Sequence, residues 1–175
     1  MDLKTYVRTV PDFPKKGVMF RDITTIFNNA SAFAEMVNQF QSAWNNYQIE
    51  AIAGIDARGF VVGGALAYKM QLPFIALRKA GKLPFKTISE EYDLEYGKAK
   101  LEIHKDALKA NQNVLIVDDL IATGGTAAAG VNLIRAVGGT VVGCGFIIDL
   151  PAIGGAERLK STGVEVKSLM VFEEN

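Results

Sequence analysis

The stretch VLIVDDLIATGGT, residues 114–126, decides the fold. Its first four residues form an all-apolar run, which is typical of a strand that is covered on both faces in a parallel sheet. Two adjacent carboxylates, Asp118 and Asp119, follow the run. A turn rich in glycine and threonine then opens a helix that we predict over 126–137. A buried strand that leads through such a turn into a helix indicates an α/β protein.

The same alternation continues on both sides of this stretch. We predict strands over 51–55, 73–77, 114–117, 140–150 and 164–169, and helices over 59–70, 126–137 and 156–160. An earlier helix is marked by an apolar stripe at steps of three and four, with Asn29 or Ser31 as its N-cap; the stripe comprises Phe33, Met36, Val37, Phe40 and Trp44. The expected fold is therefore a single α/β domain over 1–175, a mostly parallel sheet of about five strands flanked by helices. Residues 1–30 are expected to be irregular.

Composition and charge exclude several classes of protein. The chain has 175 residues, of which 49% are hydrophobic and 22% charged, and its formal net charge is zero. This balance argues against a protein that coats nucleic acid or an anionic membrane. One cysteine, Cys144, and one histidine, His104, exclude an internal disulfide and a multi-histidine metal site. No apolar run approaches a membrane span and the first residues do not resemble a signal peptide, so we expect a cytoplasmic location.

The turn that follows the two carboxylates is a candidate phosphate site. Its glycines allow backbone N–H groups to approach a ligand, and the helix start adds unpaired amides and the positive end of its dipole. The turn contains no lysine, which excludes the P-loop of nucleotide hydrolases. Two carboxylates beside a phosphate would face sugar hydroxyls, so the pattern points to a sugar phosphate. A generic α/β turn, as in receiver-type domains, is the alternative.

This stretch resembles the signature with which the type I phosphoribosyltransferase family binds phosphoribosyl pyrophosphate. The loop DARG, residues 56–59, follows the first buried strand and is similar to the family's pyrophosphate loop. Further motifs resemble the branch of the family that acts on adenine; they are FP at 13–14, FRDI at 20–23, LRK at 77–79 and LEYGK at 94–98. The match runs in order from about residue 8 to about residue 150.

The resemblance implies an activity and a set of site residues. The activity is transfer of the 5-phosphoribosyl group from phosphoribosyl pyrophosphate to N9 of adenine, which gives AMP and pyrophosphate. Glu95, Asp118 and Asp119 are the implied catalytic residues, with Glu95 over the base and the two aspartates beside the ribose. The implied substrate-binding residues are Met19, Phe20 and Arg21 in a base-binding hood formed by residues 1–30, Asp56, Ala57, Arg58 and Gly59 in the pyrophosphate loop, Lys79, Lys82 and Tyr96, and the phosphate turn Ala122, Thr123, Gly124, Gly125 and Thr126. Mg²⁺ is the implied cofactor, held mainly by the pyrophosphate and not by a protein ligand set, and the implied assembly is a homodimer.

Residues 78–100 fit neither a helix nor a buried strand, and they carry many charges. We interpret the segment as a lid that closes over bound substrate, excludes water and brings lysines to the pyrophosphate. A surface hairpin without a task is the alternative.

Two other functions stay open at this point. The same reaction on hypoxanthine, xanthine or orotate is one, and a non-catalytic regulator that senses phosphoribosyl pyrophosphate is the other. The motif Gly143-Cys144-Gly145 lacks a third glycine and lies in an apolar strand, so we interpret it as packing, with Cys144 as a small buried side chain. His104 is expected at the surface, and the aromatic stripe that ends at Trp44 in the core.

Overall fold

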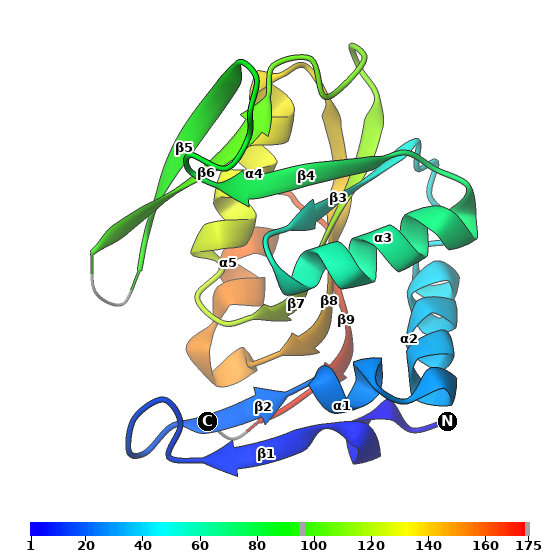
Figure 1. Ribbon diagram of the computed structural model, residues 1–175, viewed down its shortest axis with the longest axis vertical. Coiled ribbons are helices and arrows are strands. Elements are labelled where there is room, and N and C mark those ends of the chain that lie inside the picture. The colour runs from blue at the N-terminus through cyan, green and yellow to red at the C-terminus, as the bar shows by residue number, and fades with distance from the viewer. Residues whose placement is uncertain (95–96, 174–175) are drawn as a thin grey trace.

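The computed structural model describes residues 1–94 and 97–173 (Figure 1). Its centre is a seven-stranded sheet. In spatial order the strands are β5 (Thr87–Asp93), β6 (Lys98–His104), β4 (Phe74–Lys79), β3 (Ala51–Ile55), β7 (Asn113–Ile121), β8 (Thr140–Asp149) and β9 (Val166–Val171). The five strands from β4 to β9 in this order pair in parallel, and they are the five that the sequence predicts. The α/β class and the parallel sheet are confirmed.

The total of about five strands is wrong, because β5 and β6 add an antiparallel hairpin to the edge of the sheet. Most hairpin side chains are polar or exposed, and only Leu101 and Ile103 are fully buried. Pairing along the whole hairpin, from Thr87 opposite His104 to Asp93 opposite Lys98, forms these strands without an apolar run in the sequence. Figure 1 shows the hairpin arching outward from the sheet on the side of α4 (Gly125–Ala136).

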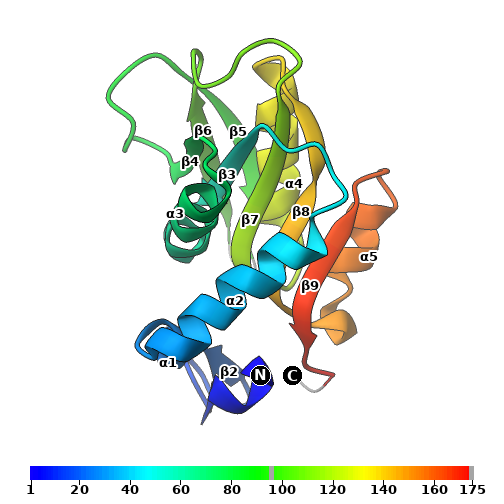
Figure 2. The same cartoon turned by 90° about the vertical axis from the view of Figure 1, so that its right-hand side faces the viewer.

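Helices cover both faces of the sheet (Figure 2). One face carries α2 (Ala30–Ala43) and α3 (Arg58–Met70), and the other carries α4 and α5 (Gly155–Lys160). Because successive side chains of a strand point to opposite faces, Val114 and Ile116 pack toward α4 and α5, whereas Leu115 and Val117 pack toward α2 and α3. Both faces of β7 are therefore apolar, which is why its sequence is an unbroken apolar run.

The first helix and the aromatic stripe follow the prediction. The Asn29 side chain caps α2 by accepting a hydrogen bond from the Ala32 amide at 2.9 Å. Phe40 and Trp44 lie in the core against β8, and a Cβ atom added at Gly145 would lie 2.9 Å from the Phe40 ring. The glycines of the Gly143-Cys144-Gly145 motif are thus needed for packing.

The single cysteine and histidine also lie where the sequence places them. Cys144 is fully buried, and burial raises the pKa of its thiol to about 12. His104 is partly exposed at the end of β6, where its Nε2 atom accepts a hydrogen bond from the Phe85 amide at 3.4 Å.

Residues 1–30 are more ordered than predicted. They contain a 3₁₀ helix, η1 (Leu3–Tyr6), a two-stranded antiparallel sheet of β1 (Arg8–Pro11) and β2 (Met19–Asp22), and a short helix, α1 (Thr24–Phe27). The expectation of irregular structure is wrong. The strands are only four residues long and are held by backbone pairing, and the prolines Pro11 and Pro14 argue against a strand in the sequence. This unit, the hood, lies at the lower end of the molecule in Figure 1.

The hood is anchored by the last described residues. Lys4 Nζ lies 4.6 Å and Arg21 Cζ 4.4 Å from the centre of the Phe172 ring, and Lys4 Nζ also donates to the Val171 carbonyl at 2.7 Å.

Among the helices of residues 1–94 and 97–173, none combines the length and the apolar character needed to cross a membrane.

Candidate active site

The two carboxylates of the quoted stretch lie inside β7 and not after it. The predicted strand ended at 117, but parallel pairing with β8 continues to Leu120 opposite Ile148 and Ile121 opposite Asp149. Backbone pairing does not require apolar side chains, so the strand continues through the two acidic residues. This extension buries Asp119, which is 8% exposed.

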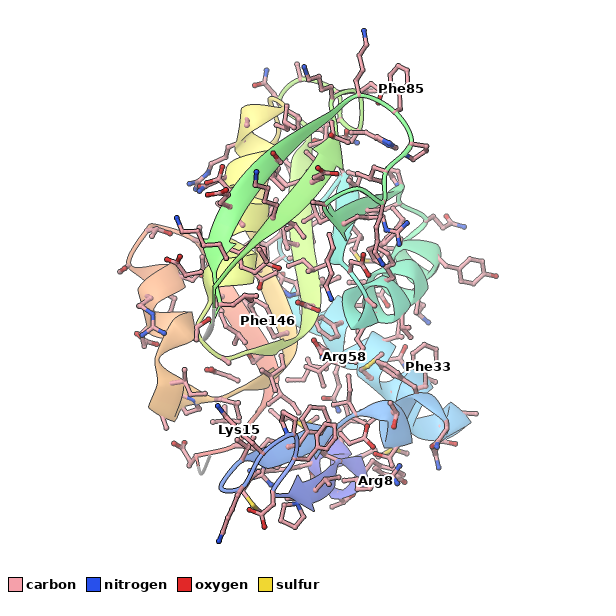
Figure 3. All side chains as sticks on the ribbon, turned by 60° about the vertical axis from the view of Figure 1, so that its left-hand side comes forward. Arg8, Lys15, Phe33, Arg58, Phe85 and Phe146 are labelled. Carbon is pink, nitrogen blue, oxygen red and sulfur yellow. The ribbon has the colours of Figure 1, made fainter. Side chains whose placement is uncertain are left out.

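The environment of Asp118 and Asp119 differs sharply. The Asp119 carboxylate forms an ion pair with the guanidinium of Arg58, which projects from the first turn of α3 toward the hood (Figure 3). Asp118 Oδ1 accepts a hydrogen bond from the Asp119 amide at 2.8 Å. Burial, followed by the neighbouring charge of Asp119, raises the pKa of Asp118 well above its usual range. Burial alone would lower the pKa of Arg58, but the hydrogen bond to Asp119 and the negative charges of Asp119, Asp118 and Asp22 together outweigh burial and raise that pKa.

The phosphate turn encloses a small cavity of about 130 Å³. Its lining includes Ala122, Thr123, Gly124 and Thr126 of the turn, together with Asp118. Gly124 has a φ of +82°, and a Cβ atom there would lie 2.9 Å from the Gly155 carbonyl oxygen. Only glycine fits this position without strain. The first amides of α4 have no partner within the helix and open toward the turn, which is the arrangement of an anion site.

A second cavity, of about 400 Å³, lies between the hood and the carboxyl ends of the parallel strands. The hood contributes Val18, Met19, Phe20 and Arg21, and the sheet side contributes Arg58, Asp118, Asp119, Leu120, Ala122, Leu150 and Ile153. Asp118, Leu120 and Ala122 line both cavities, and Asp118 is the charged residue among them. A ligand that reaches from the phosphate turn to the hood therefore passes Asp118.

The pyrophosphate-loop candidates lie at the start of α3. The Asp56 carboxylate accepts hydrogen bonds from Arg78 Nε and from the Lys79 amide, both at 3.4 Å. A Cβ atom at Gly59 would lie 2.9 Å from the Val117 carbonyl oxygen and 3.0 Å from Asp118 Oδ1. The glycine thus lets the first turn of α3, with Ala57 beside it, approach β7 closely.

Some candidate residues lie apart from these cavities. Lys79 and Lys82 are exposed, and the Lys82 carbonyl oxygen accepts a hydrogen bond from Arg78 Nη1 at 3.4 Å. Gly125 lies on the side that faces the hairpin, where an added Cβ atom would lie 3.4 Å from the Asp93 carbonyl oxygen. Glu95 and Tyr96 lie outside the described residues, so their roles stay predictions.

Sequence reasoning missed several residues around the site; they are Val18, Arg78, Leu150, Ile153 and Arg158. Leu150 and Ile153 follow the carboxyl end of β8, so the rule that ligands bind at strand ends could have found them. Arg78 stands in a motif that the resemblance rests on, but its contact with Asp56 joins residues 22 positions apart and has no local signal. Nothing in the local sequence marks Arg158.

The family model for the phosphoribosyl transferase domain matches residues 22–170 of the chain. The chain belongs to the phosphoribosyltransferase family. The adenine phosphoribosyltransferase of Maricaulis maris is 50% identical over 173 residues, which cover 99% of each chain. Within the family the chain groups with the adenine phosphoribosyltransferases.

Solved structures of phosphoribosyltransferases show the same fold. The adenine phosphoribosyltransferase of Thermoanaerobacter pseudethanolicus superposes with a TM-score of 0.93 at 44% identity, over 98% of each chain. The enzyme of Saccharomyces cerevisiae, solved in complex with an imino-altritol bisphosphate and adenine, has a TM-score of 0.91 at 35% identity over 97% of each chain.

Proposed function

We propose that the chain transfers the 5-phosphoribosyl group from phosphoribosyl pyrophosphate to N9 of adenine, releasing pyrophosphate and forming AMP. It acts as a single domain, with residues 1–30 as the hood over the base. The observation that carries this function is the position of Asp118, which lines both the phosphate cavity and the cavity below the hood. A phosphoribosyl group that spans these two cavities places its ribose beside Asp118.

The phosphate turn orients the sugar. The amides at the start of α4 and the hydroxyls of Thr123 and Thr126 hold the 5-phosphate, and this remote contact fixes the direction of the anomeric carbon. As the bond to pyrophosphate breaks, positive charge develops on the ribose. The carboxylate of Asp118 stabilises that charge in a site with little water. Asp119 contributes through Arg58, whose position it fixes.

Mg²⁺ is best placed on the pyrophosphate. The carboxylates at this edge of the sheet already have partners: Asp119 pairs with Arg58, Asp56 accepts from Arg78 and Lys79, and Asp118 accepts from the Asp119 amide. Within residues 1–94 and 97–173, no three His, Cys, Asp or Glu side chains cluster as a metal ligand set. When bound, Mg²⁺ neutralises charge on the leaving group. The protein's part is to orient the pyrophosphate through the amides of the α3 start and the lysines of the hairpin side.

The hairpin β5–β6 is the proposed lid. It lies against α4, where Asn132 Nδ2 donates to Glu90 Oε1 at 2.9 Å, and the end of β5 at Asp93 lies beside Gly125 of the phosphate turn. Closure of this segment over the ribose excludes water, which would otherwise compete with adenine for the anomeric carbon.

The direct test mixes the protein with phosphoribosyl pyrophosphate, Mg²⁺ and one base at a time, and measures nucleotide and pyrophosphate by chromatography. We expect AMP with adenine, a fall in AMP on chelation with EDTA, and recovery when excess Mg²⁺ is restored. A product with hypoxanthine, xanthine or orotate alone would identify a different transferase. Binding of phosphoribosyl pyrophosphate without any product would favour a regulator, and full activity after exhaustive chelation would contradict the role of Mg²⁺.

Loss of a hydroxyl from the phosphate turn tests the sugar-phosphate site. We expect Thr126→Val to raise the KM for phosphoribosyl pyrophosphate by roughly 10-fold, because one hydrogen bond to a charged group is lost while side-chain volume is kept. Gly124→Val is a poorer test, since its positive φ and the nearby Gly155 carbonyl would strain the fold. The control is Thr140→Val, at the exposed start of β8. Equal KM values for Thr126→Val and the wild type would place the phosphate elsewhere.

The cytoplasmic location and the homodimer stay proposals. The location rests on the sequence, in which no apolar run approaches a membrane span, and cell fractionation tests it. The homodimer rests on the family resemblance, and sedimentation equilibrium tests it.

A further inference from the structure

Arg158 of α5 reaches back across the surface to the phosphate turn. Its Nε and Nη2 atoms donate to the Thr123 carbonyl oxygen at 3.3 and 2.9 Å, and Nη2 also donates to the Ile153 carbonyl oxygen at 3.0 Å. The planar guanidinium thus ties the turn between β7 and α4 to the segment that follows β8. Lysine could not form this fork, because its single ammonium lacks the planar arrangement of donors.

These contacts are part of a set that fixes consecutive carbonyls of the turn. The Ala122 carbonyl accepts from the Gly155 amide at 3.0 Å, the Thr123 carbonyl accepts from Arg158, and the Gly124 carbonyl accepts from the Ala128 amide at 2.9 Å. In a trans peptide unit the C=O and the following N–H point in opposite directions. Fixing the Thr123 carbonyl toward Arg158 therefore directs the Gly124 N–H away from Arg158.

The backbone of α5 is shaped to allow this contact. A Cβ atom at Gly155 would lie 2.7 Å from both the Gly124 nitrogen and the Thr123 carbonyl carbon. A Cβ atom at Gly154, which has a φ of +82°, would lie 3.1 Å from Arg158 Nη1. The two glycines let α5 and its arginine approach the turn closely.

We propose that Arg158 is a positioning residue for substrate binding: it holds the Thr123–Gly124 peptide unit so that the amides of the turn face the 5-phosphate. The inference rests on the proposed function and deepens it. A charged donor on a carbonyl also polarises the peptide unit, which makes the Gly124 N–H a stronger donor to an anion.

Arg158 is poorly placed to bind the phosphate itself. Its side chain borders a cavity that it shares with Glu90, Glu91 and Asp93 of the hairpin, and these carboxylates disfavour an anion there. Two of its three donor nitrogens are engaged with carbonyl oxygens. Its effect on the ligand therefore passes through the backbone of the turn.

The test compares Arg158→Met, Arg158→Lys and the control Lys160→Met. Lys160 lies on the same helix and its ammonium pairs with Glu157 at 2.8 Å, so the control removes one positive charge from α5 without touching the turn. For each protein the KM for phosphoribosyl pyrophosphate, the KM for adenine, kcat and Tm are measured, and wild-type binding of phosphoribosyl pyrophosphate is checked by calorimetry.

We expect Arg158→Met to raise the KM for phosphoribosyl pyrophosphate by about 10-fold or more, with the KM for adenine within about twofold of wild type. Arg158→Lys should recover part of this loss of affinity. Lys160→Met should leave the KM for phosphoribosyl pyrophosphate unchanged. If Arg158→Met does not fold, Arg158→Lys against Lys160→Met gives the same comparison.

Three results would overturn the inference. One is an unchanged KM for phosphoribosyl pyrophosphate in Arg158→Met, and another is an equal rise in both KM values together with a lowered Tm, which would mark a purely structural role. A third is a loss of the same size in Lys160→Met, which would mark a general charge effect. Failure of the wild-type protein to bind phosphoribosyl pyrophosphate would instead overturn the proposed function, and this inference with it.

Discussion

Adenine is expected to be used with a kcat/KM about 10²–10⁴-fold above that of hypoxanthine, through contacts with backbone and not with side chains. The cavity below the hood is lined by Met19, Phe20 and Arg21 of β2. Among the described strands β2 pairs only with β1, so one of its edges is open to a ligand. Residues two apart in a strand direct their C=O and N–H groups to the same edge, so positions 19 and 21 can offer one acceptor beside one donor.

Adenine presents the complement to such an edge. Its N6 amino group donates and its N1 accepts, whereas hypoxanthine presents an accepting O6 and a donating N1–H. With hypoxanthine both contacts would place like groups against each other in a water-poor pocket. Each unpaired buried polar group costs roughly 1–3 kcal/mol, and two such mismatches give the expected discrimination.

Competition assays with both bases measure this selectivity directly. Met19→Leu is the matched variant, because it changes the side chain and leaves the backbone edge as it is, and it should keep the preference for adenine. Phe20 is held by an edge-to-face contact with Phe13, with ring centres 5.1 Å apart, so the segment should keep its shape in the variant. Comparable kcat/KM values for the two bases would refute selection by the backbone of β2.

The parallel sheet could be predicted from the sequence because its strands are buried on both faces. Val114 to Val117 show this most clearly, since they contribute alternately to the two cores. The hairpin β5–β6 could not be predicted in the same way. Its strands face solvent over most of their length and are specified mainly by pairing with each other. β6 does carry a short alternation of apolar and polar residues, at Ala99, Leu101 and Ile103, which the interpretation of residues 78–100 as a segment without a strand pattern missed.

The location of the site could also be predicted, but its internal contacts could not. The phosphate turn and the start of α3 could be identified from glycine-containing turns at strand ends, because the close approach of backbone that requires these glycines is visible in the local sequence. The ion pair between Arg58 and Asp119 joins residues 61 positions apart, and the bond from Arg158 to Thr123 spans 35. Such pairs depend on how β7 lies against α3 and α5, which no local pattern encodes.

Asp118→Asn is expected to lower kcat by about 10²–10³-fold and at the same time to stabilise the protein. The amide keeps the volume of the carboxylate and can still accept the hydrogen bond from the Asp119 amide. It removes the negative charge that faces the ribose, so the developing positive charge loses its partner. Single-turnover measurements at saturating substrate isolate this loss from product release.

The gain in stability follows from the raised pKa of Asp118. Between the unfolded pKa, about 3.9, and the higher folded pKa, the native state binds one more proton than the unfolded state. The free energy of unfolding that this group contributes therefore falls as pH rises through that window, so at neutral pH the carboxyl group of Asp118 destabilises the fold. Asparagine has no such charge, so the Tm of the variant should exceed that of wild type at pH 7 and the difference should vanish at acidic pH.

Asp149→Asn separates the two effects. Burial also raises the pKa of Asp149, at the end of β8, and its Oδ1 atom is buried without a hydrogen-bond partner, but its side chain does not line either cavity of the site. We expect this variant to be stabilised as well, with kcat unchanged. If Asp118→Asn were stabilised but fully active, the charge would serve no purpose in the reaction. A destabilised and inactive Asp118→Asn would instead mean that the carboxylate is needed for the fold. A stabilised and inactive Asp118→Asn would support the catalytic role, because a charge that is kept at a cost in stability is explained by its use in the reaction.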